Sequence, residues 1–304
     1  MLPYSISYLK NFLYNNLDID VKCLDLNVKF HYLRFPALHK AIVELRQKKP
    51  YTPEVLQQYA MMLETVEREA ADIYYANNKA VLAGQQPEFL QELMSFILDE
   101  KPDLVAFSLV YSSQCFYTKA ILDELKKNGI ATLVGGPAVN SKIKTLCQFM
   151  ANEVEMVESI AQKYPALKKY DDGMKNTQTN SLIRDKGAQE HPYHCDTIPD
   201  FSDYPLEEYF LLEKMIPVKT CSTCFYKQCT FCTHFADVPY LEYNVDNIRK
   251  TIVQSGAKYV FFVDDMIAKN RLLELATMLK PLGVKWWCQL RPTKDLLEVF
   301  PELY

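Results

Sequence analysis

Two features that often decide where a protein works are missing from this sequence of 304 residues. No apolar run approaches the ~20 residues that a membrane-spanning helix needs. The first residues have neither the basic region nor the apolar region of a signal peptide. An excess of one charge is missing as well, because 38 acidic residues oppose 34 basic ones and leave a net charge of −4. We therefore expect neither a membrane nor a nucleic acid as a partner.

A disulfide framework is not expected either. The nine cysteines are scattered, apart from one local group, along a chain long enough for two domains and a substantial core. Dense disulfides belong to small secreted domains that cannot bury a sufficient core. The pattern is typical of a reducing compartment, and we predict a cytoplasmic protein.

The local group of cysteines lies in residues 216–235, IPVKTCSTCFYKQCTFCTHF. Cys224, Cys229 and Cys232 follow the spacing C-x4-C-x2-C, and an aromatic residue, Phe231, precedes the last cysteine. Three thiolates on one short loop can bind three irons of a 4Fe-4S cluster and leave the fourth iron open to another ligand. The loop follows a predicted strand at residues 215–219, and loops at the carboxyl ends of strands hold the active sites of β/α barrels.

Three other readings of these cysteines remain open. Cys221 extends the run to C-x2-C-x4-C-x2-C, which allows a zinc site, although zinc ribbons separate their two pairs by about fifteen residues or more. The other two are chance spacing and a disulfide framework, and the composition opposes the framework. A further group, His191, His194 and Cys195, could also suggest a metal site, but no fourth ligand is in view and a plain linker explains it.

The cysteine loop resembles the cluster loop of radical S-adenosylmethionine (SAM) enzymes. The commonest spacing in that family is C-x3-C-x2-C, and the longer first gap, with Phe225 and Tyr226 after the first cysteine, is similar to a subgroup that carries an N-terminal cobalamin-binding domain. The preceding segment 199–210, PDFSDYPLEEYF, is similar to the linker found there. Where the family usually has Arg-Gly before the first cysteine, this chain has Ser222 and Thr223, which affects the geometry of the loop more than its ligands.

This resemblance implies a radical SAM enzyme that modifies a small-molecule or peptide substrate. Its cofactors would be a 4Fe-4S cluster, SAM and cobalamin, and its partner a reductant of the flavodoxin or ferredoxin type. The cluster would cleave SAM reductively to a 5′-deoxyadenosyl radical, and cobalamin-dependent methyl transfer is the expected outcome. The alternative is a zinc-binding or a non-catalytic cobalamin-binding module. The backbone around Phe231 would contact the adenine.

Residues 258–263 and 284–290 are predicted strands that alternate with helices at 245–254 and 269–282. Polar residues follow both strands, and at a carboxyl edge of the sheet they are placed to contact a ligand. Asp264 and Asp265 could hydrogen-bond the ribose or the amino group of SAM, and Arg291 its carboxylate, although strand-end carboxylates can also be helix N-caps.

The N-terminal part reads as a doubly wound α/β unit. Strands at 104–110 and 130–134 flank a helix at 114–128, and another strand is predicted at 21–26. Ligands bind beyond the carboxyl ends of such strands. The segment resembles the second half of cobalamin-binding domains, although the Asp-x-His-x-x-Gly motif of many of them is missing. The residues expected to face cobalamin are Ser108, Tyr111, Ser112, Gln114, Gly135, Gly136 and Pro137.

The predicted fold class is therefore α/β, with three parts. Residues 1–145 form a cobalamin-binding-like domain with a parallel sheet, 146–214 a helix and linker, and 215–304 the first part of a radical SAM β/α barrel. Further helices are expected at 5–15, 32–48, 53–81, 87–98 and 143–162. The family resemblance implies more strands than are present at either end, so we expect a fragment of a longer protein.

Overall fold

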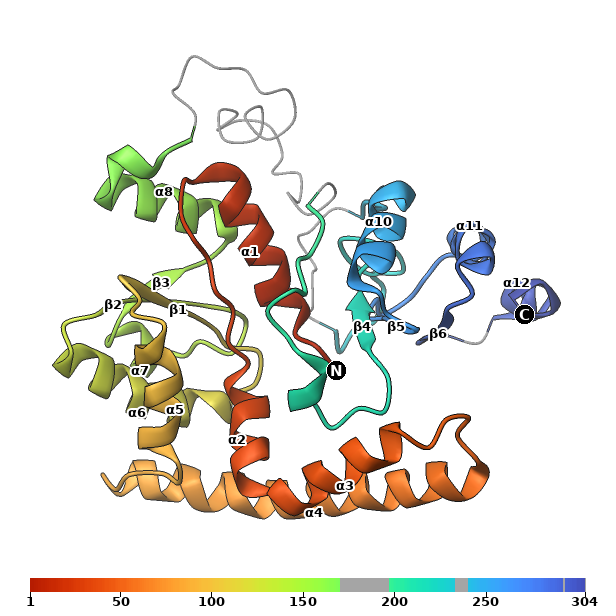
Figure 1. Cartoon of the computed structure of the whole chain (residues 1–304). Coiled ribbons are helices and arrows are strands. Elements are labelled where there is room, and N and C mark those ends of the chain that lie inside the picture. Colours follow the sequence, from red (N-terminus) through yellow and green to blue (C-terminus); the bar gives the residue numbers. More distant parts are fainter. Residues whose placement is uncertain (170–196, 233–239, 292, 304) are drawn as a thin grey trace. The chain divides into compact units, whose positions relative to one another are not determined.

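The computed structural model describes residues 1–169, 197–232, 240–291 and 293–303. It is a mixed α/β protein with two small parallel sheets (Figure 1). The chain divides into two compact units, which we name by their strands. The β1–β3 unit contains Lys22–Leu167 and Tyr204–Leu212, and the β4–β6 unit contains Met1–Val21, Lys168–Asp203 and Glu213–Tyr304. The predicted α/β class is confirmed at this level.

The sheet of the β1–β3 unit contains β1 (Leu104–Ser108), β2 (Ala131–Gly135) and β3 (Gln148–Met150) in that order. All pairs are parallel, and β1 and β2 run in register from Leu104 opposite Ala131 to Ser108 opposite Gly135. Parallel neighbours need a crossover, which α6 (Gln114–Lys127) supplies between β1 and β2. The carboxyl ends of the first two strands therefore meet at one edge of the sheet.

The helices of this unit supply most of its core. They are α2 (Leu26–Arg34), α3 (Pro36–Arg46), α4 (Pro53–Leu82), α5 (Leu90–Asp99), α7 (Ser141–Lys144) and α8 (Glu153–Lys163), with short 3₁₀ turns at Pro165–Leu167 and Leu206–Glu208. The apolar faces of α5 and α6 pack on one another and on β1 through Met94, Ile121 and Leu125. No helix in the described part of the chain combines the length and the apolar character needed to cross a bilayer.

The long helix α4 (orange in Figure 1) confirms the predicted helix at 53–81. Its start follows from two residues. The hydroxyl oxygen of Thr52 accepts a hydrogen bond from the backbone N–H of Val55, and Pro53 occupies the first helical position, where its missing N–H costs nothing.

The predicted strand at 21–26 is wrong. The chain has no strand there, and helix α2 begins at Leu26. Asp25 explains the difference, because its carboxylate accepts hydrogen bonds from the backbone N–H groups of Asn27 and Val28 and caps the helix. An N-cap is a local signal, and here it outweighs the short apolar pattern of residues 21–26, to which Asp25 itself belongs.

Two predicted helices also have different bounds. The expected helix at 32–48 is two helices, which separate at Phe35 because Pro36 starts a new one. The expected helix at 143–162 is α7, strand β3 and α8, and asparagines at 140 and 152 cap the two helices. A strand of three residues cannot be distinguished from a helical turn by periodicity alone.

The segment 204–212 belongs to the β1–β3 unit because side chains of its helices bind the segment's backbone. The Tyr59 hydroxyl donates to the carbonyl of Phe210 at 2.9 Å, and Nε of Arg46 donates to the carbonyl of Leu211 at 2.6 Å. The hydroxyl of Tyr209 donates to Asp25 at 3.0 Å. The linker-like sequence is therefore a packed part of this unit.

His31 on α2 is expected to make the β1–β3 unit less stable at mildly acidic pH. Burial lowers the pKa of its imidazole, and the charge of Asp25 opposes this effect only in part. The unfolded chain then binds a proton at a higher pH than the folded chain. The stabilising effect of a neutral His31 is therefore complete above about pH 6.5 and is lost as the pH falls towards the folded pKa.

Urea unfolding at about pH 7.5 and at about pH 5.5 would measure this effect. A His31→Gln variant should lose less stability between the two pH values than the parent. Burial also lowers the pKa of His39, so a His39→Gln variant serves as the matched comparison. This variant should keep the part of the acid-induced loss of stability that His31 causes. Equal acid sensitivity of the parent and the His31 variant would contradict the expectation.

The second sheet contains β4 (Met215–Val218), β5 (Tyr259–Phe262) and β6 (Lys285–Cys288), again parallel and in chain order. Helices α10 (Val245–Ser255) and α11 (Lys269–Leu279) connect them, and a 3₁₀ turn at Lys280–Leu282, α12 (Lys294–Leu297) and a turn at Phe300–Leu303 complete the unit. Phe262 and Leu272 are fully buried. The predicted alternation of strands and helices after residue 215 is confirmed.

The first helix, α1 (Tyr4–Asn16), belongs to the β4–β6 unit. Its Lys10 pairs with Asp200 and Asp203 at 2.9 Å each, and its Asn11 donates to the carbonyl of Ile198. The predicted division at residues 145 and 214 differs from this grouping, which follows contacts between segments far apart in the sequence. Residues 170–196, including His191, His194 and Cys195, lie outside the described part of the chain.

Candidate metal centre at the cysteine loop

The cysteine loop, residues 219–243, follows the carboxyl end of β4 and is closed at its base by short antiparallel pairing. The N–H of Tyr243 donates to the carbonyl of Thr220 at 2.8 Å, and the N–H of Ser222 donates to the carbonyl of Leu241 at 2.9 Å. Cys221 lies opposite Glu242 between these two bonds. The first and last residues of the loop are therefore held together, and the cysteines extend from this base.

Asp264, which follows β5, contacts the base of the loop. Its carboxylate is buried and accepts hydrogen bonds at 3.0 Å from the backbone N–H groups of Thr220 and Cys221. Burial raises the pKa of this carboxyl group, while the hydrogen bonds from Cys221 and Thr220 act in the opposite direction. The side chain predicted to face SAM thus binds the chain's own backbone.

Cys221 is the first of the four cysteines in the run, and its thiol has partners within the protein. The sulfur is buried, 3.1 Å from Oδ1 of Asp264 and 3.3 Å from the carbonyl oxygen of Thr223. Burial raises the pKa of this thiol, and the neighbouring Asp264 charge raises it further. A thiol in this setting remains protonated and donates a hydrogen bond, whereas a metal ligand must be a thiolate.

The three predicted ligands differ from Cys221 in exposure. Cys224 is half-buried, and Cys229 and Cys232 are exposed. The last two are close in the chain, where the N–H of Cys232 donates to the carbonyl of Cys229 at 3.1 Å. In the described residues, no three His, Cys, Asp or Glu side chains are gathered into a group that could hold a metal ion. The structure thus places the thiols on one exposed loop without bringing them together.

The chemistry of this loop nevertheless fits a metal group that binds through three thiolates. Two of the three thiols are exposed, and ligand binding and local ordering are coupled in many cysteine sites. Directly before Cys224, the hydroxyl oxygen of Thr223 is buried and has no hydrogen-bond partner among the described residues. A bound group with acceptor atoms would satisfy that hydroxyl.

Arg291, after β6, contacts the loop through Tyr226. Its guanidinium carbon is 4.6 Å from the ring centroid of Tyr226, a cation–π distance. Hydrogen bonding to Tyr226 raises the pKa of Arg291, and the nearby Cys229 adds to the effect. Asp265 is exposed next to buried Asp264, and Phe231 is 88% exposed. Of the predicted SAM contacts outside the loop, Asp264 contacts its base and Arg291 contacts Tyr226 within it.

Arg271 of α11 is a residue that sequence reasoning missed. It is 4% exposed, and its guanidinium donates to the backbone carbonyls of Thr220 and Tyr243, at the two ends of the loop. A signal existed, because Arg271 lies four residues before Leu275 and so falls on the buried stripe of its helix. An arginine among the apolar residues of a helix needs buried acceptors.

In the β1–β3 unit, the residues predicted to face cobalamin lie at the carboxyl ends of β1 and β2. Ser108 pairs in register with Gly135, and the amide oxygen of Gln114 accepts hydrogen bonds from the N–H groups of Val110 and Tyr111. Tyr111 is 68% exposed, and Ser112 and Pro137 are exposed too. The structure therefore brings this set together at one edge of the sheet.

Gly136 has a structural explanation at that edge. Its φ of +105° is unfavourable for other residues, and a Cβ placed there would lie 2.3 Å from the carbonyl oxygen of Leu109. The turn needs this approach, because the N–H of Leu109 donates to the carbonyl of Gly135 and the N–H of Ala138 to that of Leu109. The contact between the strand ends is enough to require glycine here.

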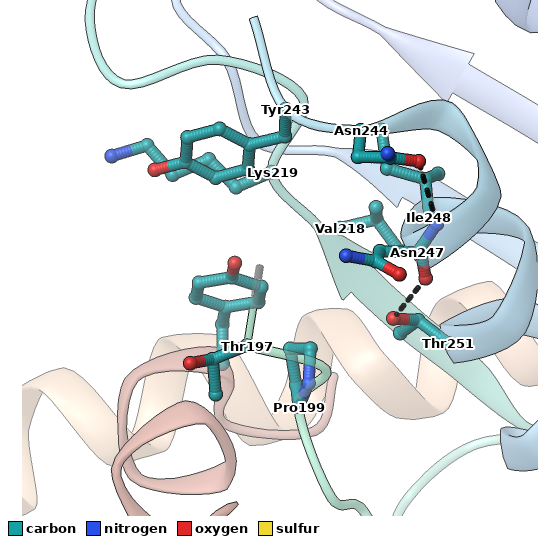
Figure 2. A pocket seen from close by; sticks show the side chains of 10 residues that line it. Thr197, Pro199, Val218, Lys219, Tyr243, Asn244, Asn247, Ile248 and Thr251 are labelled. Carbon is teal, nitrogen blue, oxygen red and sulfur yellow. Dashed lines mark hydrogen bonds between the residues drawn. The ribbon is translucent and has the colours of Figure 1, made fainter. Parts of the chain in front are cut away.

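A small pocket in the β4–β6 unit lies beside the carboxyl end of β4 (Figure 2). Lys219 and Tyr243 lie on one side of the pocket and Asn247 on another. The backbone carbonyl of Asn247 accepts a hydrogen bond from the Thr251 hydroxyl at 2.9 Å. The pocket volume of about 20 Å³ has room for about one water molecule. None of the predicted site residues lines it, so the cysteine loop remains the candidate centre.

No known protein family, curated protein or solved structure matches this chain in the comparisons of sequence and fold.

Proposed function

We propose that Cys224, Cys229 and Cys232 bind a 4Fe-4S cluster and that the protein is a radical SAM enzyme. The observation that supports this best is the environment of Cys221, whose buried sulfur lies 3.1 Å from a carboxylate oxygen of Asp264 and 3.3 Å from the carbonyl oxygen of Thr223. Of the four cysteines in the run, three remain for a metal. A tetrahedral zinc site made from the run needs all four, whereas a cluster with one open iron needs three.

The residues around the loop have distinct tasks in this proposal. The three thiolates hold the metal group, and Asp264 holds the backbone from which they extend. Arg291 binds the carboxylate of SAM, Asp265 its ribose or amino group, and the backbone at Phe231 its adenine. When bound, the cluster and SAM supply a carbon radical by reductive cleavage of the sulfonium. The protein positions the reactants and excludes water.

The β1–β3 unit is proposed to bind cobalamin at the carboxyl edge of its sheet. Ser108, Tyr111 and Ser112 lie there, and hydroxyl groups suit the amide arms of a corrin ring. With cobalamin bound, the protein would transfer a methyl group to a small-molecule or peptide substrate in the cytoplasm. A flavodoxin- or ferredoxin-type protein would supply the electrons. The β4–β6 unit would then form part of a radical SAM β/α barrel.

Anaerobic reconstitution of the full chain tests the metal assignment. With iron and sulfide, we expect a brown protein with broad visible absorption and about four irons per chain. Parallel incubation with zinc should leave less than one tightly bound ion per chain. A colourless protein that retains one zinc per chain would replace the cluster with a zinc site.

Two further measurements on the reconstituted protein separate an enzyme from a binding module. Under reducing conditions we expect 5′-deoxyadenosine from SAM, detected by chromatography. We also expect added cobalamin to remain with the protein through gel filtration. A protein that binds cobalamin and assembles the cluster, yet leaves SAM intact, would be the non-catalytic alternative.

A further inference from the structure

We propose that Arg271 is a positioning residue for the cysteine loop, and that with Asp264 it holds the peptide group between Thr220 and Cys221 from both ends. This inference rests on the proposed function, because it assigns Arg271 a part in metal retention. It goes further because it names a residue outside the loop, on helix α11, as the reason why the three thiols extend from a fixed base.

The contacts of the guanidinium carry the argument. One of its terminal nitrogens donates to the carbonyl of Thr220 at 3.2 Å and also to the carbonyl of Tyr243. These two residues are themselves paired, because the N–H of Tyr243 donates to the carbonyl of Thr220. Arg271 therefore joins the segment that enters the loop to the segment that leaves it.

Asp264 contacts the same peptide group from its other end. Its carboxylate accepts from the N–H of Cys221, which forms one peptide group with the carbonyl of Thr220, and Arg271 donates to that carbonyl. Both side chains are 4% exposed. A buried negative and a buried positive charge are thus linked through one peptide group, and each offsets part of the cost of burying the other.

The remaining partner of Arg271 lies at the surface. Its other terminal nitrogen donates to the carboxylate of Glu274 at 2.7 Å, and the Glu274 side chain is 52% exposed. A half-exposed ion pair of this kind contributes little to stability. The buried contacts of Arg271 with the loop base are therefore the ones that matter, and Glu274 offers a matched control on the same side chain.

The test compares Arg271→Met, Arg271→Lys and Glu274→Gln with the parent chain. Methionine keeps much of the side-chain length without donors, and lysine keeps the charge without the planar arrangement of donors. Hydrogen–deuterium exchange of the metal-free chain reports whether the base of the loop opens. Iron per chain after anaerobic reconstitution reports retention, and thermal unfolding reports global stability.

In the Arg271→Met variant we expect about 100-fold faster exchange at residues 220–222 and 241–243, with the strand β5 amides unchanged. We also expect about tenfold less iron per chain. Arg271→Lys should lie between this variant and the parent in both measurements, and Glu274→Gln should match the parent.

Three results would overturn the inference. The first is parent-like exchange at the base of the loop in Arg271→Met, and the second is faster exchange spread evenly over the whole β4–β6 unit, which indicates a general structural role. The third is full iron retention in that variant. If the parent itself retains no iron, the assignment of Arg271 to metal retention is overturned with the cluster, whereas loss of iron from Arg271→Met alone supports both.

Discussion

A Cys229→Ala variant is expected to retain at least about tenfold less iron than the parent after anaerobic reconstitution. The thiol of Cys229 is exposed, so its removal leaves no cavity and disturbs no packing. Loss of iron from this variant would therefore reflect the loss of a ligand. Iron and sulfide assays, together with the visible spectrum, measure the change, and the same result is expected for Cys224 and Cys232.

Two other cysteines of the same unit provide the controls. Cys221→Ser keeps a hydrogen-bond donor for Asp264 and should retain iron close to the parent level, because Cys221 is not a ligand in this assignment. Burial raises the pKa of Cys288 to about 11, which makes it a poor thiolate, and Cys288→Ala should also retain iron. Equal losses from Cys221→Ser and Cys229→Ala would favour a four-thiol zinc site instead.

A Gly136→Ala variant is expected to destabilise the β1–β3 unit by roughly 2–4 kcal/mol. Two effects add here. The φ of +105° is unfavourable for alanine, and the added methyl group would lie within 3 Å of the Leu109 backbone, including 2.3 Å from its carbonyl oxygen. Because the Leu109 backbone after β1 cannot move aside easily, the turn that follows β2 has to open. Urea unfolding followed by circular dichroism measures the loss.

Gly129→Ala separates the two effects. Gly129 also has a positive φ, +70°, but a Cβ there would meet nothing within 4 Å. We expect about 1 kcal/mol of destabilisation from conformation alone. If both variants lose the same free energy, the close approach to Leu109 contributes nothing. The glycine at 136 would then need another explanation, such as a bound ligand.

The Gly136 contact also changes what supports cobalamin binding. Gly136 is one of the residues expected to face cobalamin, and the contact with Leu109 accounts for the glycine without a ligand. The assignment therefore depends on the exposed residues Tyr111 and Ser112 and on Ser108. Cobalamin retention by variants at these positions is a better test than substitution of the glycines.

Long periodic segments could be predicted from the sequence, as could the strands that alternate with helices after residue 215, whereas the short segments at 21–26 and 148–150 could not. The helix at Pro53–Leu82 has a cap, a proline start and a sustained apolar stripe, which together leave few alternatives. Residues 21–26 have only a weak apolar pattern, and Asp25 within this segment caps helix α2. Strand β3 has three residues, and its pairing with β2 defines it as a strand.

The cysteine loop shows the same division. Local spacing was enough to single out Cys224, Cys229 and Cys232 as candidate ligands, because ligands on one loop are close in sequence. The partners of Cys221 could not be found in this way. Its thiol meets Asp264 more than forty residues along the chain, through a contact that exists only when β4 and β5 are paired.

What can be read along the chain, then, is the α/β character, the alternation of strands and helices, and the spacing of the three thiols, since these depend on neighbouring residues. Folding decided the rest. It placed helix α1 in the same unit as β4, directed Asp264 to the backbone of the loop, and brought Arg271 to the carbonyls of Thr220 and Tyr243. Buried polar groups must find partners wherever the fold provides them, and sequence separation says little about which partner that will be.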